Sequence, residues 1–219
     1  MGGDLEKECK KAAQILKNFV DKKRIPPEVV KNAKGLAIFS GFRAAMWLAG
    51  AGGSGVIIAR LPDGSWSPPS AISVFSGGVG VVYGIDVYDC ICVLNTQEAV
   101  DAYAKGETTL GAAATMAAGP IGGTADITTK DVKPIWTYTK SLGLYGGITV
   151  DGTIIKEKSD VNARAYGGKI TAAQILKGEA RSVPSGQLPE VLKLAEGNAA
   201  DSKILDSIST EPTPGDLKE

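Results

Sequence analysis

The N-terminal residues 4–24 have the spacing of an amphipathic helix. Apolar side chains recur every three or four residues, and at about 100° per residue they share one broad face. That face consists of Leu5, Cys9, Ala12, Ala13, Ile15, Leu16, Phe19 and Val20. The basic side chains on the other side or just beyond the helix are Lys7, Lys10, Lys11, Lys17, Lys22, Lys23 and Arg24. The proline pair at 26–27 ends this helix, and a short second helix is predicted at 28–33.

Two interpretations of this helix differ in where the apolar face goes. In one, the face docks on the core of the domain and the lysines stay in water, as in most amphipathic helices of globular proteins. In the other, the face inserts into a membrane while the lysines contact lipid phosphates. The pattern alone favours docking, because Glu6, Glu8 and Asp21 dilute the basic side.

From residue 35 onward the pattern changes to short apolar runs that are rich in β-branched residues and separated by glycines, which indicates strands. Strands are predicted at 35–40, 43–48, 56–61, 85–94, 116–123, 135–139 and 142–150. Two chain reversals are predicted from local turn chemistry. Pro62-Asp63-Gly64 turns the chain toward Trp66, and Asp151-Gly152 has the composition of a two-residue hairpin.

Three further helices are predicted at 97–104, 171–177 and 189–196, and the chain beyond Gly197 is polar. The predicted fold is α+β, a single domain with a glycine-rich antiparallel β core that is barrel- or sandwich-like. N-terminal amphipathic helices precede the core and short C-terminal helices follow it. The predicted divisions are an N-terminal helical segment at 1–34, a β-rich body at 35–197 and a disordered polar tail at 198–219.

The charges balance over the whole chain, with 24 Lys and Arg residues against 24 Asp and Glu residues, so no overall field favours nucleic acid as a partner. The balance is uneven locally, because residues 1–34 hold nine basic and five acidic side chains. Attraction to an anionic surface would therefore belong to the N-terminal segment. No stretch has the pattern of a signal peptide or of a membrane-spanning helix.

The sequence contains no histidine, which excludes Ser-His-Asp and Cys-His catalysis and histidine-ligated metal sites. Cys90 and Cys92 lie in the apolar run CICVL and are predicted to be buried, reduced and inert. Glycines at 50, 52 and 55 match the dinucleotide-binding pattern, but an apolar strand follows them where that pattern requires a helix. No metal or cofactor is predicted, and Ser54 has no recognisable base, so the chain is predicted not to be an enzyme.

Six segments that occur in order from about residue 5 to residue 195 resemble the SYLF domain, a module of endocytic adaptor proteins. They are AKGLAIFS, GGSGVIIARLPDGSWSPPSAI, VLNTQEAVDAYAKG, AAGPIGG, YTKSLGLYGGITVDGTII and NARAYGGKITAAQILKG. The resemblance implies a phosphoinositide-binding and actin-binding module of the membrane–actin cortex, active in endocytosis. It implies a cytoplasmic protein, peripheral at the plasma membrane or an endosomal membrane.

In that family the lipid contact is attributed to the N-terminal amphipathic helix, so the resemblance favours the membrane interpretation over the docked one. The lipid-binding residues that it implies are Lys7, Lys10, Lys11, Lys17, Lys22, Lys23, Arg24, Leu16 and Phe19. The alternative function is a protein-interaction scaffold that binds actin or other partners without contacting lipid. A nucleotide-dependent enzyme that uses the glycines at 50–55 ranks far below both.

Overall fold

The fold is known from a computed structural model that describes residues 3–104, 135–141, 144–181, 183 and 185–215. Its strands are β1 (Gly35–Ala59), β2 (Ser70–Leu94), β3 (Ile135–Ser141) and β4 (Leu144–Glu157). Its helices are α1 (Gly3–Asp21), α2 (Pro27–Asn32), α3 (Gln97–Ala104), α5 (Ser159–Tyr166), α6 (Ala172–Leu176), α7 (Leu188–Ala195) and α8 (Ser202–Asp206). The α+β class predicted from the sequence is confirmed.

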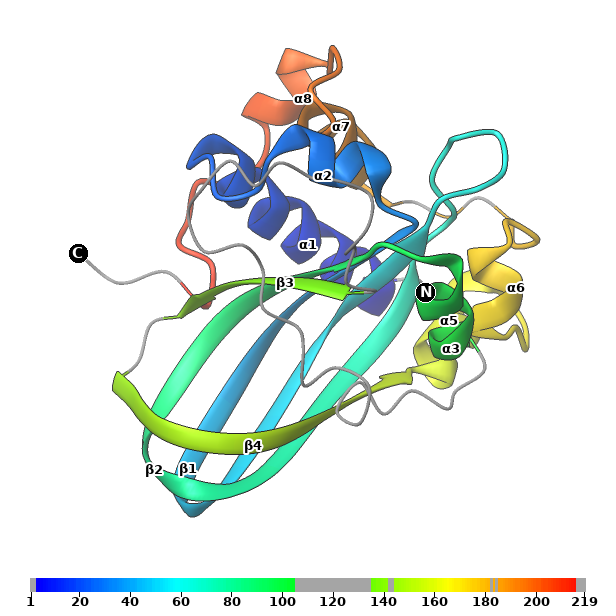
Figure 1. The fold of residues 1–219 in the computed structure, drawn as a ribbon. Helices are drawn as coiled ribbons and strands as arrows, with labels where there is room; N and C mark the ends of the chain where they lie inside the picture. Colours follow the sequence, from blue (N-terminus) through cyan, green and yellow to red (C-terminus); the bar gives the residue numbers. More distant parts are fainter. Residues whose placement is uncertain (1–2, 105–134, 142–143, 182, 184, 216–219) are drawn as a thin grey trace.

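The central strand of the sheet is β2. It pairs antiparallel with β1 along almost its whole length, from Gly35 opposite Leu94 to Ile57 opposite Ser70. The other edge of β2 pairs with β3 over residues 88–94 and with β4 over residues 72–85, again antiparallel. The described strands form an open sheet, in which the long β1–β2 hairpin bends over on itself (Figure 1).

The bend in β1 brings its two ends side by side. The backbone N–H of Arg60 donates to the carbonyl oxygen of Lys34 at 2.8 Å. Farther along the strand, a side chain at Gly53 would meet the carbonyl oxygen of Ser40 at 2.5 Å, and one at Gly55 would overlap the backbone of Ile38. The glycine-rich stretch after residue 50 is therefore required by close approach of backbone to backbone, and no helix begins there.

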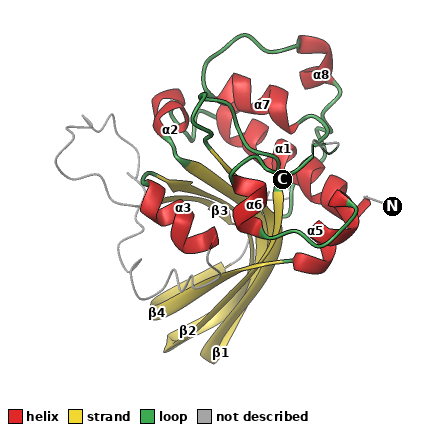
Figure 2. Cartoon of the chain, turned by 90° about the vertical axis from the view of Figure 1, so that its right-hand side faces the viewer, coloured by secondary structure: helices red, strands yellow, loops and turns green. Residues whose placement is uncertain are grey.

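Helices cover both faces of the sheet at one end, and β1, β2 and β4 extend beyond them (Figure 2). The sheet has an apolar core on each face. Alternate residues of β1 pack into one core or the other, because successive side chains of a strand point to opposite faces. Leu36 and Ile38 pack with the apolar sides of α1 and α7, whereas Ala37 and Phe39 pack on the face covered by α3 and α6. The sheet is thus the middle of three layers where its helices lie.

Several local predictions agree with the structure. The helices at 97–104 and 171–177 correspond to α3 and α6, and Thr171 and Gln174 form a reciprocal capping box at the start of α6. The turn after Pro62 is also present, with Gly64 at a φ of 85° and a β-bridge between Arg60 and Trp66. A positive φ is the conformation for which glycine is suited.

Other predictions are wrong, and each fails because a distant partner outweighs a local preference. Asp151-Gly152 forms no hairpin, since β4 runs straight through it and pairs with Gly77 and Gly78 of β2. The strands at 43–48 and 56–61 belong to one continuous β1. The tail predicted to be disordered after residue 197 forms α8 and then packs against the body as far as residue 215. The strand predicted at 116–123 lies outside the described residues.

Candidate functional site

The apolar side of α1 is fully used inside the domain. Leu16 is 0% exposed and Phe19 is 1% exposed. Both pack in the core that α1 shares with α7 and β1, where Val191 and Leu192 are among their cluster partners. In this arrangement Leu16 and Phe19 contact the body and not a membrane, so the docked interpretation of the helix describes the structure.

Two of the lysines implicated by resemblance are engaged within the domain. Lys11 Nζ donates to the carbonyl oxygen and to the hydroxyl of Ser54, at 3.0 and 3.1 Å, and pairs with Glu8 at 2.6 Å. Lys17 pairs with Asp21 one turn farther along α1. Lys11 therefore fastens α1 to β1, and the Ser54 hydroxyl accepts a hydrogen bond from a charged donor.

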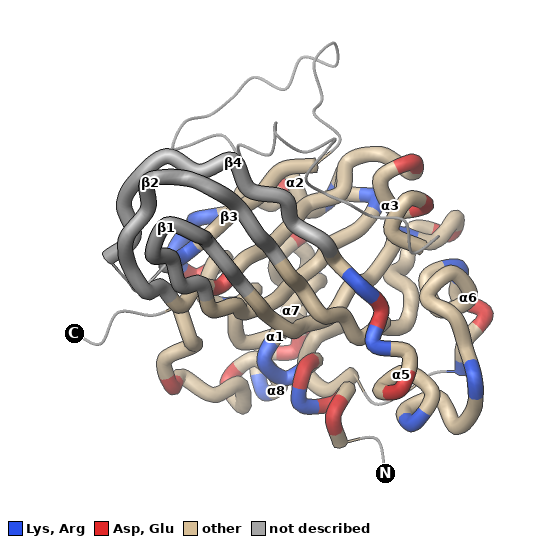
Figure 3. The backbone as a smooth tube through the Cα atoms, turned by 90° about the horizontal axis from the view of Figure 1, so that it is seen from below, with Lys and Arg blue, Asp and Glu red and all other residues tan. Residues whose placement is uncertain are grey.

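Within the N-terminal segment at 1–34, most of the basic side chains exposed to solvent lie after the end of α1. Lys7 and Lys10 are exposed on the helix, but α1 carries four lysines against four acidic residues, and the two signs alternate along it (Figure 3). Residues 22–34 instead hold five basic residues and one acidic residue. Lys22, Lys23 and Arg24 are consecutive and exposed. We refer to these three residues as the basic corner.

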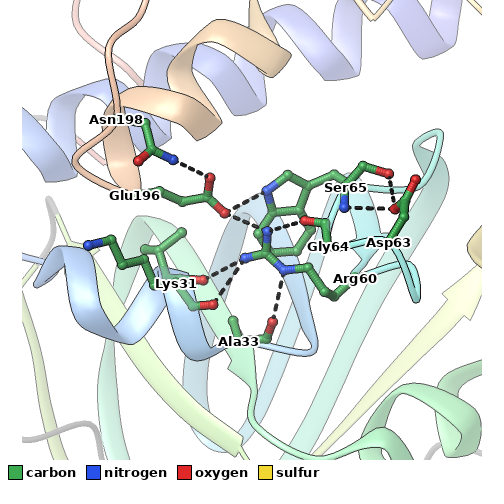
Figure 4. Close-up of polar contacts among 10 residues, drawn as sticks. Lys31, Ala33, Arg60, Asp63, Gly64, Ser65, Glu196 and Asn198 are labelled. Carbon is green, nitrogen blue, oxygen red and sulfur yellow. Dashed lines mark hydrogen bonds and ion pairs between the residues drawn. The ribbon is translucent and has the colours of Figure 1, made fainter.

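A second polar cluster joins the turn after β1 to the end of α7 (Figure 4). The Arg60 guanidinium lies over the Trp66 ring at 3.7 Å and pairs with Glu196, to which the Trp66 indole N–H also donates at 3.1 Å. Arg60 also donates to the carbonyl oxygens of Val30 and Gly64, both at 3.0 Å. Its donors are thus directed to groups of the protein, which indicates a structural clamp.

A cavity of about 500 Å³ adjoins this clamp. Trp66, Pro68, Leu188 and Leu192 line it, and Lys193 stands at its edge in an ion pair with Glu190. Ser65, which also lines the cavity, donates its hydroxyl to the Asp63 carboxylate at 2.6 Å within the turn that follows β1. Sequence analysis did not identify the cavity, because Arg60 and Glu196 are 136 residues apart in the chain.

A buried ion pair is the third polar feature, and the sequence did not predict it. Asp89 is 0% exposed and lies 3.2 Å from Lys140 Nζ, on the neighbouring strand β3. The Ser40 hydroxyl donates to the same carboxylate at 2.7 Å, and Thr213 contacts both charged groups. The available signal was an aspartate directly before the apolar run CICVL of β2.

The cysteines are buried, as predicted. Cys90 Sγ and Cys92 Sγ are 3.8 Å apart, and the three cysteines form no disulfide. Burial raises the pKa of the Cys9 thiol to about 12, with the nearby Glu8 and Glu6 carboxylates adding to the shift. A hydrogen bond from Cys90 lowers the pKa of Cys92. No group of three or more metal-ligating side chains occurs among the described residues.

The described helices include none that combines the length and the apolar character needed to cross a membrane.

The chain is similar in sequence to a known family of proteins. Residues 75–195 match the family model Ysc84, described as Las17-binding protein actin regulator. The chain is 42% identical over 193 residues to LAS seventeen-binding protein 3 of Saccharomyces cerevisiae, which covers 83% of this chain and 42% of that protein. It is 40% identical over 200 residues to SH3 domain-containing YSC84-like protein 1 of Homo sapiens, which covers 86% of this chain and 58% of that protein.

A second yeast relative, Protein YSC84 of Saccharomyces cerevisiae, is 38% identical over 207 residues, covering 89% of this chain and 44% of that protein. The chain thus spans about half the length of the curated relatives that it matches. No solved structure matches the chain.

Proposed function

The chain belongs to the Ysc84 family of actin regulators, and from this premise we propose that it binds phosphoinositide-containing membranes and actin filaments at the membrane–actin cortex. Family membership agrees with the resemblance to the SYLF domain and supports a role in actin regulation. Membrane binding, a peripheral location and a part in endocytosis are the finer elements of the proposal. The absence of enzymatic activity stays a prediction.

The observation that carries the lipid proposal is the orientation of α1. Its apolar side is buried, so the helix binds lipid while docked, through charge alone. Each Lys or Arg near an anionic membrane contributes about 1 kcal/mol. The basic corner with Lys7 and Lys10 would then contribute about 5 kcal/mol, which corresponds to a sub-millimolar dissociation constant. Such binding is reversible, and salt weakens it because charges are screened over about 10 Å at 0.1 M.

Charge reversal at the basic corner tests this proposal. We expect Lys22→Glu/Lys23→Glu/Arg24→Glu to abolish sedimentation with vesicles that contain phosphatidylinositol bisphosphate in phosphatidylcholine. The matched control is Lys156→Glu/Lys169→Glu/Lys177→Glu, which makes the same change of charge at exposed lysines on β4 and next to α6. Control vesicles carry phosphatidylserine at equal surface charge, and they distinguish recognition of the inositol headgroup from general attraction.

The results separate three cases. Loss of binding in the corner variant alone supports the proposed surface. Wild-type binding by the corner variant would place the membrane contact elsewhere, and Lys7→Glu/Lys10→Glu would then test the helix itself. Absence of wild-type binding to either vesicle at low salt would remove the lipid half of the proposal.

The scaffold alternative is favoured by a different observation. Phe42 and Phe75 are 49% and 51% exposed, which is unusual for large apolar side chains. The alternation of side chains along β1 and β2 places Phe42 and Phe75 on the face of the sheet that α1 covers. Phe75 pairs with Gly52, which has no side chain to cover it. Exposed aromatic residues commonly contribute to protein–protein contacts.

Actin co-sedimentation tests this alternative. We expect Phe42→Ser/Phe75→Ser to weaken co-sedimentation with actin filaments while vesicle binding stays unchanged. If the wild-type protein sediments with actin filaments and with none of the vesicles, the scaffold function is supported instead of the lipid-binding function. Equal filament binding by the double variant would exclude this aromatic pair as the contact.

A further inference from the structure

The chain after α8 forms a strap that crosses α1 and ends on the sheet. We define this strap as residues 208–215; it runs down beside α1 toward the end of β3 (Figure 1). Ile208 is buried in the core shared by α1 and α7. Gln14 of α1 donates to the carbonyl oxygen of Glu211 at 3.1 Å, and Thr213 and Gly215 are buried at the far end.

The end of the strap is held by the buried carboxylate of Asp89. Thr213 Oγ1 donates to Asp89 Oδ2 at 2.6 Å, and the backbone N–H of Gly215 donates to the same oxygen at 3.0 Å. Within the body, the Ser40 hydroxyl and the Lys140 ammonium contact the carboxylate at 2.7 and 3.2 Å. The strap therefore supplies half of these four contacts. A charged group without its partners is costly to bury, so the carboxylate favours a closed strap.

Thr213 is the contact through which the strap meets both charges. Its hydroxyl donates to Asp89 and accepts a hydrogen bond from Lys140 Nζ at 2.8 Å. A hydroxyl has one proton to donate, so this orientation is fixed by the two charged neighbours. Thr213 is 5% exposed, and Gly215 leaves no room for even one added carbon.

We propose that Thr213 is a phosphorylation site that releases the strap. The sequence Thr213-Pro214 has the pattern that proline-directed protein kinases accept, and the strap is a short segment outside the sheet that can open without unfolding it. In the reaction Thr213 Oγ1 attacks the γ-phosphorus of ATP. The bond from that phosphorus to the bridging oxygen breaks, ADP leaves, and the hydroxyl proton passes to solvent.

The charge of the phosphate prevents the phosphorylated strap from closing again. The new group carries about −1.5 to −2 charges at neutral pH, and the hydrogen that Thr213 donated to Asp89 is lost. Lys140 already neutralises Asp89, so the cluster would gain about two uncompensated negative charges. Phosphorylation thus stabilises the open conformation of the strap relative to the closed one.

Release of the strap would uncover part of α1. The strap and α1 enclose a groove of about 190 Å³, with Gln14, Lys17 and Lys22 on the helix side. Opening removes the Gln14–Glu211 contact and exposes this side of the helix to solvent. The phosphorylation site goes beyond the proposed function, and its test requires neither a membrane nor an actin filament.

The chain contains a second site of the same pattern that serves as an internal control. Ser67 precedes Pro68 in the loop that leads into β2, where its hydroxyl donates to the Pro68 carbonyl oxygen at 2.9 Å and accepts from the N–H of Ala59 at 3.0 Å. Ser67 and Thr213 are about equally buried, at 6% and 5% exposure. Ser67 lies in the connection between two paired strands, whereas Thr213 lies in the strap, so the two sites isolate the effect of the strap.

The experiment treats the folded protein with a proline-directed kinase and ATP, and locates the phosphate by mass spectrometry. We expect phosphate on Thr213 and none on Ser67. Hydrogen exchange should then become about tenfold or more faster in the strap, while β2 amides stay protected. A synthetic peptide of residues 207–219 confirms that the kinase accepts the sequence. The absence of phosphate on Thr213 when this peptide is phosphorylated would overturn the proposal, as would phosphorylation that leaves exchange in the strap unchanged.

Two substitutions test the same point without a kinase. Thr213→Glu introduces a negative charge against Asp89 and should open the strap, whereas Thr213→Val removes the hydroxyl without adding charge and should open it less. Susceptibility of the strap to limited proteolysis measures both. A Thr213→Glu protein whose strap resists proteolysis as the wild type does would contradict a charge-driven release.

Discussion

Replacing Leu16 with Ala distinguishes a docked α1 from one that leaves the body to enter a membrane. Leu16 is 0% exposed, so its side chain contributes to folding and reaches no lipid while the helix is docked. A helix that inserts would lose membrane affinity when this residue is truncated. A helix that stays docked would lose stability alone.

The magnitudes favour the docked helix. Burying a large apolar side chain contributes about 1.5–3 kcal/mol, and α1 buries four such residues, so detaching it forfeits about 6–12 kcal/mol. The four residues are Leu5, Ile15, Leu16 and Phe19. Whole domains are stable by only about 5–15 kcal/mol. Leaving the body would therefore cost nearly as much as unfolding, and we expect α1 to remain docked when the protein binds a membrane.

Leu16→Ala should lower the free energy of unfolding by about 2–5 kcal/mol, the range measured for buried leucines. At about 2–4 °C per kcal/mol for a chain of this size, Tm falls by about 4–20 °C. Circular dichroism measures Tm, and vesicle sedimentation well below Tm should give wild-type binding. Ile204→Ala on α8 is the control, since Ile204 is 36% exposed and its truncation should change neither quantity appreciably. Reduced vesicle binding by a folded Leu16→Ala protein would refute the docked mode.

Three further predictions concern the body. Arg60→Ala should lower the free energy of unfolding, measured by chemical denaturation, by about 3 kcal/mol because it leaves Glu196 without its charged partner. The double variant Arg60→Ala/Glu196→Gln should recover part of that loss. Gly55→Ala should destabilise by about 1–3 kcal/mol through overlap with the facing backbone, whereas Gly52→Ala, with its nearest atom at 4.0 Å, should be close to neutral. The raised pKa of Cys9 means that the folded state favours the protonated thiol. The contribution of this thiol to the free energy of unfolding is fully present below pH 9 and is lost as the pH rises from 9.0 to about 12. Cys9→Ala should remove that part of the pH dependence, as measured by denaturation titrations at several pH values.

The sequence predicted best those elements whose partners are near in the chain. The apolar positions of α1 could be assigned because their spacing alone defines the buried side, and all the large ones are buried. The cap at Thr171 and the turn at Gly64 depend on a few consecutive residues. What remained undecided was the destination of the buried side, because an apolar helix face has the same pattern whether a sheet or a membrane covers it.

The predictions that were wrong concern elements whose partners are far apart in the chain. Asp151-Gly152 has ideal hairpin chemistry, yet it lies opposite Gly77 and Gly78 in an uninterrupted β4. The strap looked disordered because it is short and polar, and it is ordered by Asp89, more than 120 residues earlier. No local pattern reveals that a carboxylate in one strand is the receptor for a distant hydroxyl.

The tandem arrangement of β3 and β4 along one edge of β2 has a consequence for the order of folding. β1 and β2 are joined by the short connection at 60–69, so their pairing can begin beside it and proceed away from it, and the contact of Gly35 with Leu94 closes last. Neither β3 nor β4 has a hydrogen-bonding edge to join until β2 is in place. Contacts across such long separations in sequence slow folding. β2 thus acts as the template on which both later strands assemble.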